Sequence, residues 1–299
     1  MKISGFTFVR NGFTYGYPFI PSILSLLPLV DELIVVVGDS EDHTREAIVA
    51  LNEPRIRIID SVWDDKLREN GTVFAQQSNL GLAAISGDWA IHLQVDEVFH
   101  EDDHIAIRNA INEADAIPEA DGILFPFYHF WGDFRHIRNT RKTHPFEIRA
   151  FKNRGIVRSY KDSQGFRKYS SEAAYEQGEE GAKLNVIKTR VPVFHYSYSR
   201  NPSLMKRKAE YFNRFWHSDE WIQEHSKEKP FDFNEVDRLE PFTGAHPTYM
   251  REVIAAQDWM FEYDPRRSNM SFKDRFMYRL NKITGKRLFE FENYKLIRK

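Results

Sequence analysis

The run of five apolar residues from Leu33 to Val37 constrains the fold of this chain more than any other stretch. An unbroken apolar run without polar alternation is typical of a parallel strand that is buried on both faces. Strand-like and helix-like segments alternate around it, with short connections. We therefore expect an α/β protein with a doubly wound, mostly parallel sheet and helices on both of its faces. The expected strands are residues 3–9, 33–37, 55–60 and 89–95, and the expected helices are residues 18–29, 42–51 and 74–85.

The pattern is less regular after residue 100. Asn201 is expected to cap a helix that runs to about His217, with Pro202 at its first position. Residues 152–185 have no clear period, so we expect a long loop there. Residues 230–247 are aromatic and loop-like. The remaining expected elements are a helix over 102–114, strands near 122–128, at 146–151 and at 185–196, and a helical region over 247–261.

Composition excludes several classes of function. The chain has no cysteine, which rules out disulfides, thiolate metal sites and a thiol nucleophile. Its net charge of −2 gives no reason to expect nucleic-acid binding. No apolar run is long enough for a membrane-spanning helix, and the first ten residues are too interrupted for a signal peptide. We therefore expect a cytoplasmic protein.

Acidic residues follow the expected strand 89–95. Asp96 and Glu97 stand where that strand ends, and Gly87 is placed to end the helix before it. Ligands of α/β proteins bind beyond the carboxyl ends of the strands, and a carboxylate there can hold a hard divalent cation against a phosphorylated substrate. The alternative is a solvated acidic turn, because three more acidic residues follow at 101–103.

Two further constellations carry polar groups at strand ends. Asp39 and Asp42 follow the Val-rich strand and could accept hydrogen bonds from a base or ribose, although helix capping explains the same residues. His195 follows another apolar run and could complete a metal shell, with Arg200 and Lys206 contacting phosphate oxygens. A buried histidine with a purely structural role is the alternative.

Two more groups lie in the irregular part of the chain. Asp162 could remove a proton from an acceptor hydroxyl, although an aspartate beside glycine is commonly a turn residue. Histidines at 129, 136 and 144 surround Trp131 and Arg135, a mixture that suits a sugar or acceptor pocket. It suits the edge of an aromatic core equally well, and the spacing does not match a zinc signature.

In their order along the chain, these segments resemble a family 2 glycosyltransferase of the GT-A fold, over roughly residues 3–200. Val9-Arg10-Asn11 resembles the family's nucleotide-binding opening. The stretch from Val35 to Thr44 resembles the family's apolar strand followed by D-x-S-x-D-x-T, with Asp39 directly before Ser40. The stretch from Asn79 through Gly87-Asp88-Trp89 to Asp96-Glu97 resembles the family's helix, turn and D-x-D strand end. The segment His195 to Pro202 is similar to bacterial members that build cell-surface polysaccharides.

The resemblance implies a nucleoside diphosphate sugar as donor, Mn²⁺ or Mg²⁺ as cofactor and inversion at the anomeric carbon. It implies that Asp39 contacts the base or ribose, that Asp96 holds the metal and that His195 joins it. Gln94 replaces the first acid of D-x-D. Its amide can still contact ribose, but one anionic ligand fewer should weaken metal binding. The donor would also contact Val9, Arg10, Asn11, Asp42, Arg200 and Lys206.

The family's catalytic base is usually a carboxylate in the acceptor half of the enzyme. Asp162 is the first choice here, Glu147 the second and Glu172 the third. The acceptor would be a hydroxyl of a saccharide or of a lipid-linked molecule. We expect residues 1–200 to form the domain that binds donor and acceptor, and residues 201–299 to form a helical extension with a basic tail.

The tail has a composition of its own. Residues 266–299 carry 11 Lys/Arg and 3 Asp/Glu, a net charge of +8, so the rest of the chain carries −10. Phe272, Phe276, Leu280 and Ile283 fall close to one helical face with basic residues around them. Such a helix can lie on anionic lipid, at the inner face of the cell membrane. The alternative is a helix docked on the core with a solvated basic side.

Two other functions remain open from the sequence. A nucleotidyltransferase has a similar sheet and metal chemistry, but usually a more glycine-rich loop than Val9 to Phe13 after its first strand. A non-catalytic protein that binds sugar nucleotides, or serves as a scaffold, is consistent with Gln94 in place of an acid.

Overall fold

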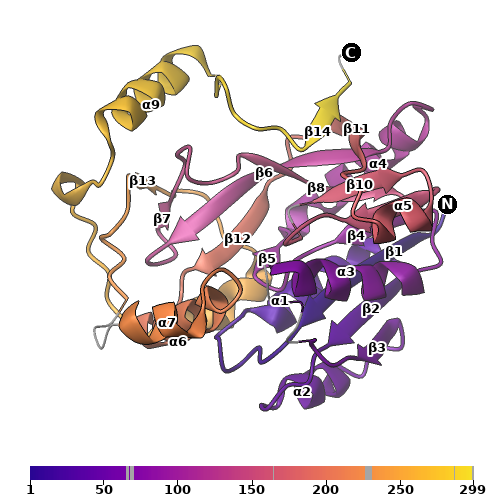
Figure 1. The fold of residues 1–299 in the computed structure, drawn as a ribbon, viewed down its shortest axis with the longest axis horizontal. Coiled ribbons are helices and arrows are strands. Elements are labelled where there is room, and N and C mark those ends of the chain that lie inside the picture. The colour runs from indigo at the N-terminus through magenta and orange to yellow at the C-terminus, as the bar shows by residue number, and fades with distance from the viewer. Residues whose placement is uncertain (65–66, 68–70, 164, 226–230, 286, 298–299) are drawn as a thin grey trace.

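The first half of the chain forms a parallel sheet in the expected place (Figure 1). The structure, a computed structural model, describes residues 1–64, 67, 71–163, 165–225, 231–285 and 287–297. Its parallel strands stand in the order β3-β2-β1-β4. Leu33 to Val37 are all buried at the centre of this sheet, as their composition predicts. The strands are β1 (Ile3–Val9), β2 (Glu32–Val37), β3 (Ile56–Asp60) and β4 (Trp89–His92).

Helices cover both faces of this parallel sheet, which confirms the doubly wound class. Successive strand residues point to opposite faces. On one face, Leu33, Val35 and Ile91 share a core with α1, α2 and α4. On the other face, Ile34 and Val36 share a core with α3 and with the later strands. The helices are α1 (Phe19–Leu26), which continues as a 3₁₀ turn η1 (Leu27–Leu29), α2 (Thr44–Ala50), α3 (Thr72–Ala84) and α4 (His104–Asp115), with the turn η3 (Glu101–Asp103) before it.

The sheet becomes mixed beyond β4. Strand β8 (Phe146–Lys152) pairs antiparallel with β4, and β6 (Gly122–Trp131) pairs antiparallel with β8. Residues 152–185 are not the loop that we expected. They contain the elements β9 (Ile156–Ser159), β10 (Phe166–Tyr169), α5 (Glu172–Glu176) and the start of β11 (Ala182–Lys188). Elements of four or five residues are too short to show a period, which explains the error.

The expected strand over 185–196 is two strands. β11 and β12 (Val193–Tyr198) both pair parallel with β6, along different parts of it. Pro192 lies in the interruption between them, and its nitrogen has no hydrogen to donate to a ladder. Strand β12 also pairs antiparallel with β5 (Glu97–Val98), which places His195 beside Glu97. The expected strand 89–95 ends earlier, at His92, so residues 93–96 form a turn between β4 and β5.

The chain after residue 200 does not stay apart from the sheet. Its last strand, β14 (Tyr294–Leu296), returns to pair parallel with β11, while α9 (Phe272–Thr284) stands away from the sheet at the upper left of Figure 1. A domain boundary at residue 200 stays a prediction. The other elements are α6 (Pro202–Asn213), α7 (Asp219–His225), η4 (Thr248–Met250), α8 (Arg251–Ala255) and η5 (Pro265–Arg267), with a short pairing of β7 (His136–Ile137) and β13 (Glu240–Pro241).

Helix α6 begins as predicted and ends before His217. The side chain of Asn201 accepts a hydrogen bond from the Ser203 nitrogen at 2.9 Å, and Pro202 is the first helical residue. Parts of the expected tail and of the loop 230–247, namely residues 286, 298, 299 and 230, lie outside the described residues. Within the described part of the chain, no helix has the length and apolar character needed to cross a membrane.

Candidate functional site

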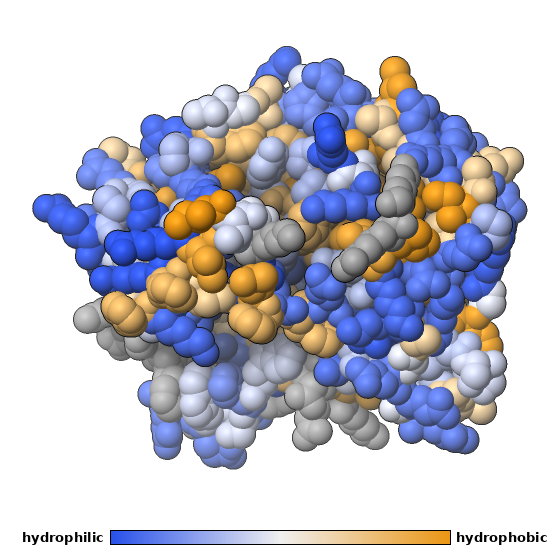
Figure 2. Space-filling model, turned by 90° about the horizontal axis from the view of Figure 1, so that it is seen from above, coloured by the Kyte–Doolittle hydropathy of each residue, from blue (hydrophilic) through white to orange (hydrophobic). Residues whose placement is uncertain are grey.

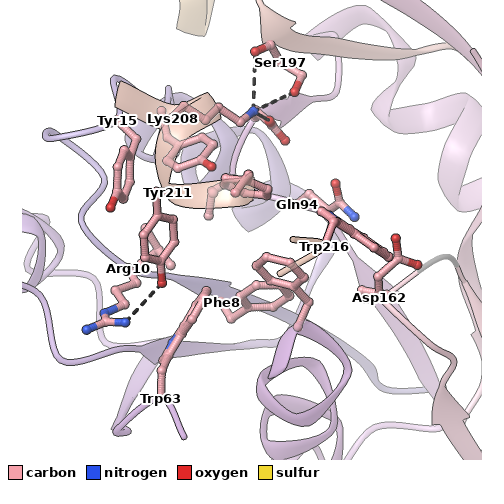
Figure 3. Close-up of a pocket in the computed structure, with 17 residues that line it drawn as sticks. Phe8, Arg10, Tyr15, Trp63, Gln94, Asp162, Ser197, Lys208, Tyr211 and Trp216 are labelled. Atoms are coloured by element: carbon pink, nitrogen blue, oxygen red, sulfur yellow. Dashed lines mark hydrogen bonds and ion pairs between the residues drawn. The ribbon is translucent and has the colours of Figure 1, made fainter. Parts of the chain in front are cut away.

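A cavity of about 260 Å³ lies at the carboxyl ends of β1 and β4 (Figure 3). This is the edge where α/β proteins bind ligands. Five sequence-predicted site residues line it: Val9, Arg10, Gln94, Asp96 and Asp162. The other residues around it are Phe8, Tyr15, Tyr17, Trp63, Phe74, Val95, Ser163, Ser197, Lys208, Tyr211, Phe212 and Trp216.

Aromatic rings form one wall of this cavity. Trp63 packs against Phe74 with ring centroids 5.5 Å apart and against Phe8 at 6.3 Å. The Arg10 guanidinium lies 5.4 Å from the Trp63 ring and donates to the Tyr211 hydroxyl at 3.1 Å. Flat rings with one cation beside them can stack on a planar base and contact a phosphate or ribose oxygen. In Figure 3 this wall lies between Arg10 on one side and Asp162 on the other.

Asp96 lies opposite this wall, in the turn between β4 and β5. Its carbonyl oxygen accepts a hydrogen bond from the Tyr196 nitrogen at 2.8 Å, which ties the turn to β12. Three basic side chains surround its carboxylate. His195 Nε2 lies 3.6 Å from Oδ1, and Arg200 Nη2 and Lys208 Nζ each lie 3.6 Å from Oδ2. The structure thus brings Asp96, His195 and Arg200 together.

Burial and charge act against each other at Asp96. Burial alone would raise the pKa of Asp96, but His195, Lys208 and Arg200 outweigh it and lower that pKa far below its usual range. Burial lowers the pKa of Lys208 to about 7, with Arg200 adding to the effect and Asp96 opposing it. The Asp96 carboxylate is therefore ionised at any ordinary pH, and its Oδ2 lies beside both Arg200 and Lys208.

Lys208 is a site residue that the sequence analysis missed. Helix α6 presents Lys208, Tyr211 and Phe212 to the cavity. The Lys208 amine donates to the Ser197 hydroxyl at 2.8 Å, as Figure 3 shows. The spacing 208, 211, 212 is the repeat of one helical face, so the helix pattern contained the signal. Lys206, which was expected to contact phosphate, lies on another face of the helix and pairs with Glu210 at 3.7 Å.

Arg200 also differs from its expected role. Its side chain is 3% exposed and is not among the described residues that line the cavity. Its Nη1 donates to the Tyr15 carbonyl oxygen at 2.7 Å, and its guanidinium lies 4.6 Å from the Tyr17 ring. Arg200 therefore stands behind Asp96 and fixes that carboxylate, where we expected direct contact with phosphate.

A chain of hydrogen bonds orients His195. His129 Nε2 lies 2.7 Å from the His144 carbonyl oxygen, and a carbonyl can only accept, so His129 carries its proton on Nε2. Burial, together with His144 and His195, holds the pKa of His129 well below its usual range, so His129 is neutral. Its bare Nδ1 then accepts from His195 Nδ1, 2.8 Å away. When His195 is neutral, this bond leaves its lone pair on Nε2, the atom that faces Asp96.

This arrangement fits a divalent cation. A carboxylate oxygen and an imidazole lone pair converge at 3.6 Å, and the other nitrogen of the imidazole is fixed by a hydrogen bond, as is usual for metal-binding histidines. Within the described residues, no cluster of three His, Asp or Glu side chains could hold a metal alone. Mg²⁺ and Mn²⁺ are commonly held by one or two protein groups together with substrate phosphates. Asp96 and His195 would be those groups, and Gln94 contributes no charge.

The residues from Asp39 to Thr44 mainly fix two loops to each other. Asp42 accepts from the Thr14 nitrogen at 2.8 Å and from the Thr44 nitrogen at 3.1 Å, at the start of α2. Asn11 Oδ1 accepts from the Glu41 nitrogen at 2.7 Å. Both side chains thus accept hydrogen bonds from backbone nitrogens of the protein itself. Asp42 does so at the start of α2, as in the helix-capping alternative. Asp39 is exposed and pairs with Arg10 at 3.1 Å beside the cavity.

A second and larger cavity, of about 1280 Å³, adjoins the first. We call it the groove. It shares Gln94, Asp162 and Ser163 with the first cavity. Its other walls come from β8 and from the end of the chain. The remaining residues that line it are Asn139, His144, Pro145, Phe146, Glu147, Arg149, Lys188, Asn281, Lys282, Gly285 and Arg287 to Tyr294.

Asp162 stands at the junction of the two cavities. Its Oδ1 is buried and has no hydrogen-bond partner within the described part of the chain. Burial raises its pKa, while a backbone hydrogen bond and Lys161 oppose that rise. Its neighbours Lys161 and Ser163 have φ angles of 53° and 65°. Residues other than glycine rarely adopt this left-handed backbone conformation. Such strain is concentrated at functional sites.

The two other candidate bases are placed differently. Glu147 lines the groove away from the first cavity, and its Oε1 accepts from the Ile148 nitrogen at 2.8 Å. Glu172 is on α5, forms an ion pair with Arg158 and is not among the described residues that line either cavity. Glu172 is therefore removed from the candidates, because an exposed pair on a remote helix cannot reach the junction.

Two other expected groupings have structural explanations. Glu97 forms a doubly hydrogen-bonded pair with Arg149, both bonds 2.6 Å long and both side chains buried.

The expected acceptor cluster is divided: His136 pairs with Asp133 at 2.9 Å, and Trp131 stacks on Tyr198 with centroids 4.2 Å apart. Only His129 and His144 of that cluster belong to the site. Arg135 pairs with Asp133 and is exposed.

No protein-family model matches the sequence. No curated protein sequence matches it either. Among solved structures, the chain is similar to TarS of S. aureus (residues 1–349), with 11% identity and a TM-score of 0.41 over 72% of this chain and 65% of that one. A structure of the same TarS fragment in complex with UDP matches 48% of this chain and 40% of its own, with 14% identity and a TM-score of 0.35.

The chain is also similar to glucosyl-3-phosphoglycerate synthase from Mycobacterium tuberculosis, in complex with Mn²⁺, UDP and phosphoglyceric acid. The identity is 16% and the TM-score 0.38, over 73% of this chain and 80% of that one. This chain thus spans 39 to 65% of the length of the TarS structures that it matches. With TM-scores of 0.35 to 0.41, these are partial likenesses. The function proposed for this chain rests on its own residues.

Proposed function

We propose that this protein is a glycosyltransferase that moves a sugar from a nucleoside diphosphate sugar to a hydroxyl acceptor. One observation carries the proposal: two cavities meet at Gln94, Asp162 and Ser163. The first has an aromatic wall for a base and a cluster of charged groups for a diphosphate. The second is large enough for an acceptor. A carboxylate with a free oxygen lies between them.

In this proposal the donor base packs against the rings around Trp63, with Arg10 beside it. The diphosphate lies near Asp96, where Lys208 faces the cavity and His195 has its lone pair. A Mn²⁺ or Mg²⁺ held by Asp96 and His195 would neutralise charge on the departing diphosphate. Lys208 donates to a phosphate oxygen, and this contact strengthens as negative charge develops there in the transition state.

Asp162 is the proposed base. It takes the proton of the acceptor hydroxyl as that oxygen forms a bond with the anomeric carbon. The bond from the anomeric carbon to the phosphate oxygen breaks, the nucleoside diphosphate leaves with the electron pair, and the configuration inverts. The pKa of Asp162, raised by burial, makes it a stronger base than a solvated aspartate. Glu147 lines the groove and is the second candidate.

The acceptor in this proposal is a saccharide, free or lipid-linked. Phe146, Tyr294 and His144 line the groove, and rings of this kind pack on the CH faces of sugars. The enzyme would work in the cytoplasm, and at the inner face of the cell membrane where the acceptor is lipid-linked.

Two lysines on one helix test the proposal. Lys208→Met removes the amine that faces the first cavity, whereas Lys206→Met removes one outside it. We expect one of UDP, GDP, CDP or dTDP to bind in calorimetry with Mn²⁺ present. The Lys208→Met protein should bind it about 10- to 100-fold more weakly, as for the loss of a hydrogen bond to a charged group. Lys206→Met should bind normally. Absence of binding to all four nucleotides would remove the proposal.

Binding alone does not distinguish an enzyme from a binding protein. Gln94, in place of an acid, is the observation that favours a non-catalytic protein with the same fold. Release of nucleoside diphosphate from a matching sugar nucleotide, measured with and without saccharide acceptors, separates the two. Tight binding without release in the presence of any acceptor would favour the non-catalytic alternative.

A further inference from the structure

Helix α9 presents three large apolar side chains to solvent, whereas Met277 and Leu280 are half-buried. Phe272, Phe276 and Ile283 are 88%, 60% and 83% exposed. At spacings of four and seven residues they share one face of the helix. None of the described residues of α9 is buried. A helix docked on the core would bury this apolar face, so the docked alternative from the sequence does not describe α9.

The opposite side of α9 holds it to the body of the protein. The Tyr278 hydroxyl donates to Glu240 at 2.6 Å, and Lys282 pairs with the same carboxylate at 2.7 Å. Ser271 and Asp274 form a capping box at its start, and Gly285 ends it with a φ of 66°. The outward apolar face therefore belongs to a formed and anchored helix.

The loop after α9 continues this exposed apolar surface. Phe289 and Phe291 are 93% and 69% exposed. Arg141 donates to the carbonyl oxygens of Leu288 and Phe289, at 2.6 and 3.3 Å, which fixes the backbone while the ring points outward. Phe289 has a φ of 58°, an outlier for a bulky residue. In Figure 2, seen from the side that carries α9, apolar atoms gather beside strongly hydrophilic ones.

Basic residues surround this surface. Lys273, Arg275 and Arg279 are exposed on α9 beside its apolar face. The segment from Arg266 to Lys299 carries a net charge of +8, whereas the rest of the chain carries −10. Apolar residues framed by cations match a bilayer with anionic headgroups, in which rings enter the interface and the cations contact phosphates.

The same segment also forms a wall of the groove. Asn281, Lys282, Gly285 and residues 287–294 line it. Arg287 donates to the Thr143 carbonyl oxygen at 2.6 Å and to Asn139 at 2.8 Å, and β14 then pairs with β11. The exposed apolar surface and the groove therefore share one segment, in which Phe289 and Phe291 belong to both.

We propose that the outward face of α9 and the loop after it form a surface that docks on an anionic membrane. Docking there would set the mouth of the groove at the bilayer, so that a lipid-linked acceptor reaches Asp162 from the membrane. The docking itself does not depend on the proposed glycosyl transfer. Only the delivery of an acceptor rests on the proposed function.

Co-sedimentation with vesicles tests the docking. The full chain is mixed with vesicles of phosphatidylcholine alone, or with about one third of phosphatidylglycerol. We expect sedimentation with the anionic vesicles and a strong decrease in high salt. Lys273→Gln, Arg275→Gln and Arg279→Gln combined should weaken binding on the order of 100-fold, at about fivefold for each cation. Phe272→Ser, Phe276→Ser and Ile283→Ser combined should abolish it.

Ile105→Ser is the matched control, because Ile105 is 76% exposed on α4, which Figure 1 places away from α9. It should sediment as the wild type does. Thermal unfolding and nucleotide binding of all variants verify that they fold. Equal sedimentation of the wild type and both triple variants would overturn the proposal. So would a dimer in light scattering that the apolar triple variant loses, because it would assign the face to a second copy. Vesicle binding without transferase activity would leave the docking intact and remove only the proposed function.

Discussion

His129 and His195 are joined through their Nδ1 atoms, which lie 2.8 Å apart. His129 is neutral and donates its only ring N–H to the His144 carbonyl oxygen. It can therefore act only as a hydrogen-bond acceptor toward His195. His129 thus fixes both the ring orientation and the tautomer of His195, whose side chain faces Asp96. A histidine within a strand of the sheet thereby controls the diphosphate end of the proposed donor site.

The first prediction concerns this positioning role. His129→Phe removes the acceptor and keeps an aromatic ring of similar breadth. We expect the affinity for Mn²⁺ in the presence of the bound nucleotide to fall about 10- to 100-fold, as when outer partners of metal ligands are lost. Nucleotide affinity without metal should change little, which a general loss of structure would not allow. The control is His136→Phe, in the separate pair with Asp133. Equal metal affinity in wild type and His129→Phe would contradict the role.

Asp96 is expected to matter for stability as well as for activity. Asp96→Asn leaves the buried Arg200 and Lys208 and the half-buried His195 without their common carboxylate. Breaking a buried ion pair from one side costs about 3 kcal/mol or more, so denaturant unfolding should show a destabilised protein along with weak nucleotide binding. Asp96→Ala would leave the same cations unpaired and add a void. Asp88→Asn, at an exposed position before β4, is the control. A variant of wild-type stability would show that the three cations do not depend on Asp96.

Asp162 and Glu172 give a matched pair for the base. Asp162→Asn removes the proton acceptor at the junction of the cavities and should lower the transfer rate about 10²- to 10⁴-fold, the usual effect of losing a general base. Nucleotide binding should persist, because the change affects the acceptor hydroxyl. Glu172→Gln should transfer at the wild-type rate. If Glu147→Gln reproduced the loss while Asp162→Asn did not, Glu147 would be the base.

The parallel half of the fold could be predicted because local patterns determine it. Leu33 to Val37 can bury their apolar side chains only in a strand that is covered on both faces of the sheet. Asp96 and Glu97 follow another strand of this sheet and are therefore expected at its carboxyl edge. Short elements such as β9 and β10 show no period and were missed. Lys208 was missed because Lys206, two residues earlier and on another face of the helix, was chosen in its place. The groove could not be predicted, since its walls join residues around 147 with residues around 290, and no local pattern encodes that pairing.

Glu147 should make stability depend on pH. Burial raises the pKa of Glu147 to about 7 from the usual 4.5, and Glu97 adds to this, whereas Arg149 and the Ile148 nitrogen oppose it. Tyr294 faces it from β14. A carboxyl group whose pKa is raised by folding binds its proton more tightly in the folded state. Its favourable contribution is complete below pH 4.5 and is lost as pH rises toward 7.

Glu147→Gln keeps an acceptor for the Ile148 nitrogen and removes the titration. The free energy of unfolding of the wild type, relative to this variant, should therefore fall between pH 4.5 and 7 by up to about 3 kcal/mol, and stay constant above that. Urea unfolding of both proteins at half-unit pH steps measures the difference. For Glu172→Gln, which changes an exposed ion pair, the free energy of unfolding relative to the wild type should not vary between pH 4.5 and 7. A difference between wild type and Glu147→Gln that does not vary with pH would mean that the groove leaves Glu147 as well solvated as a surface carboxylate.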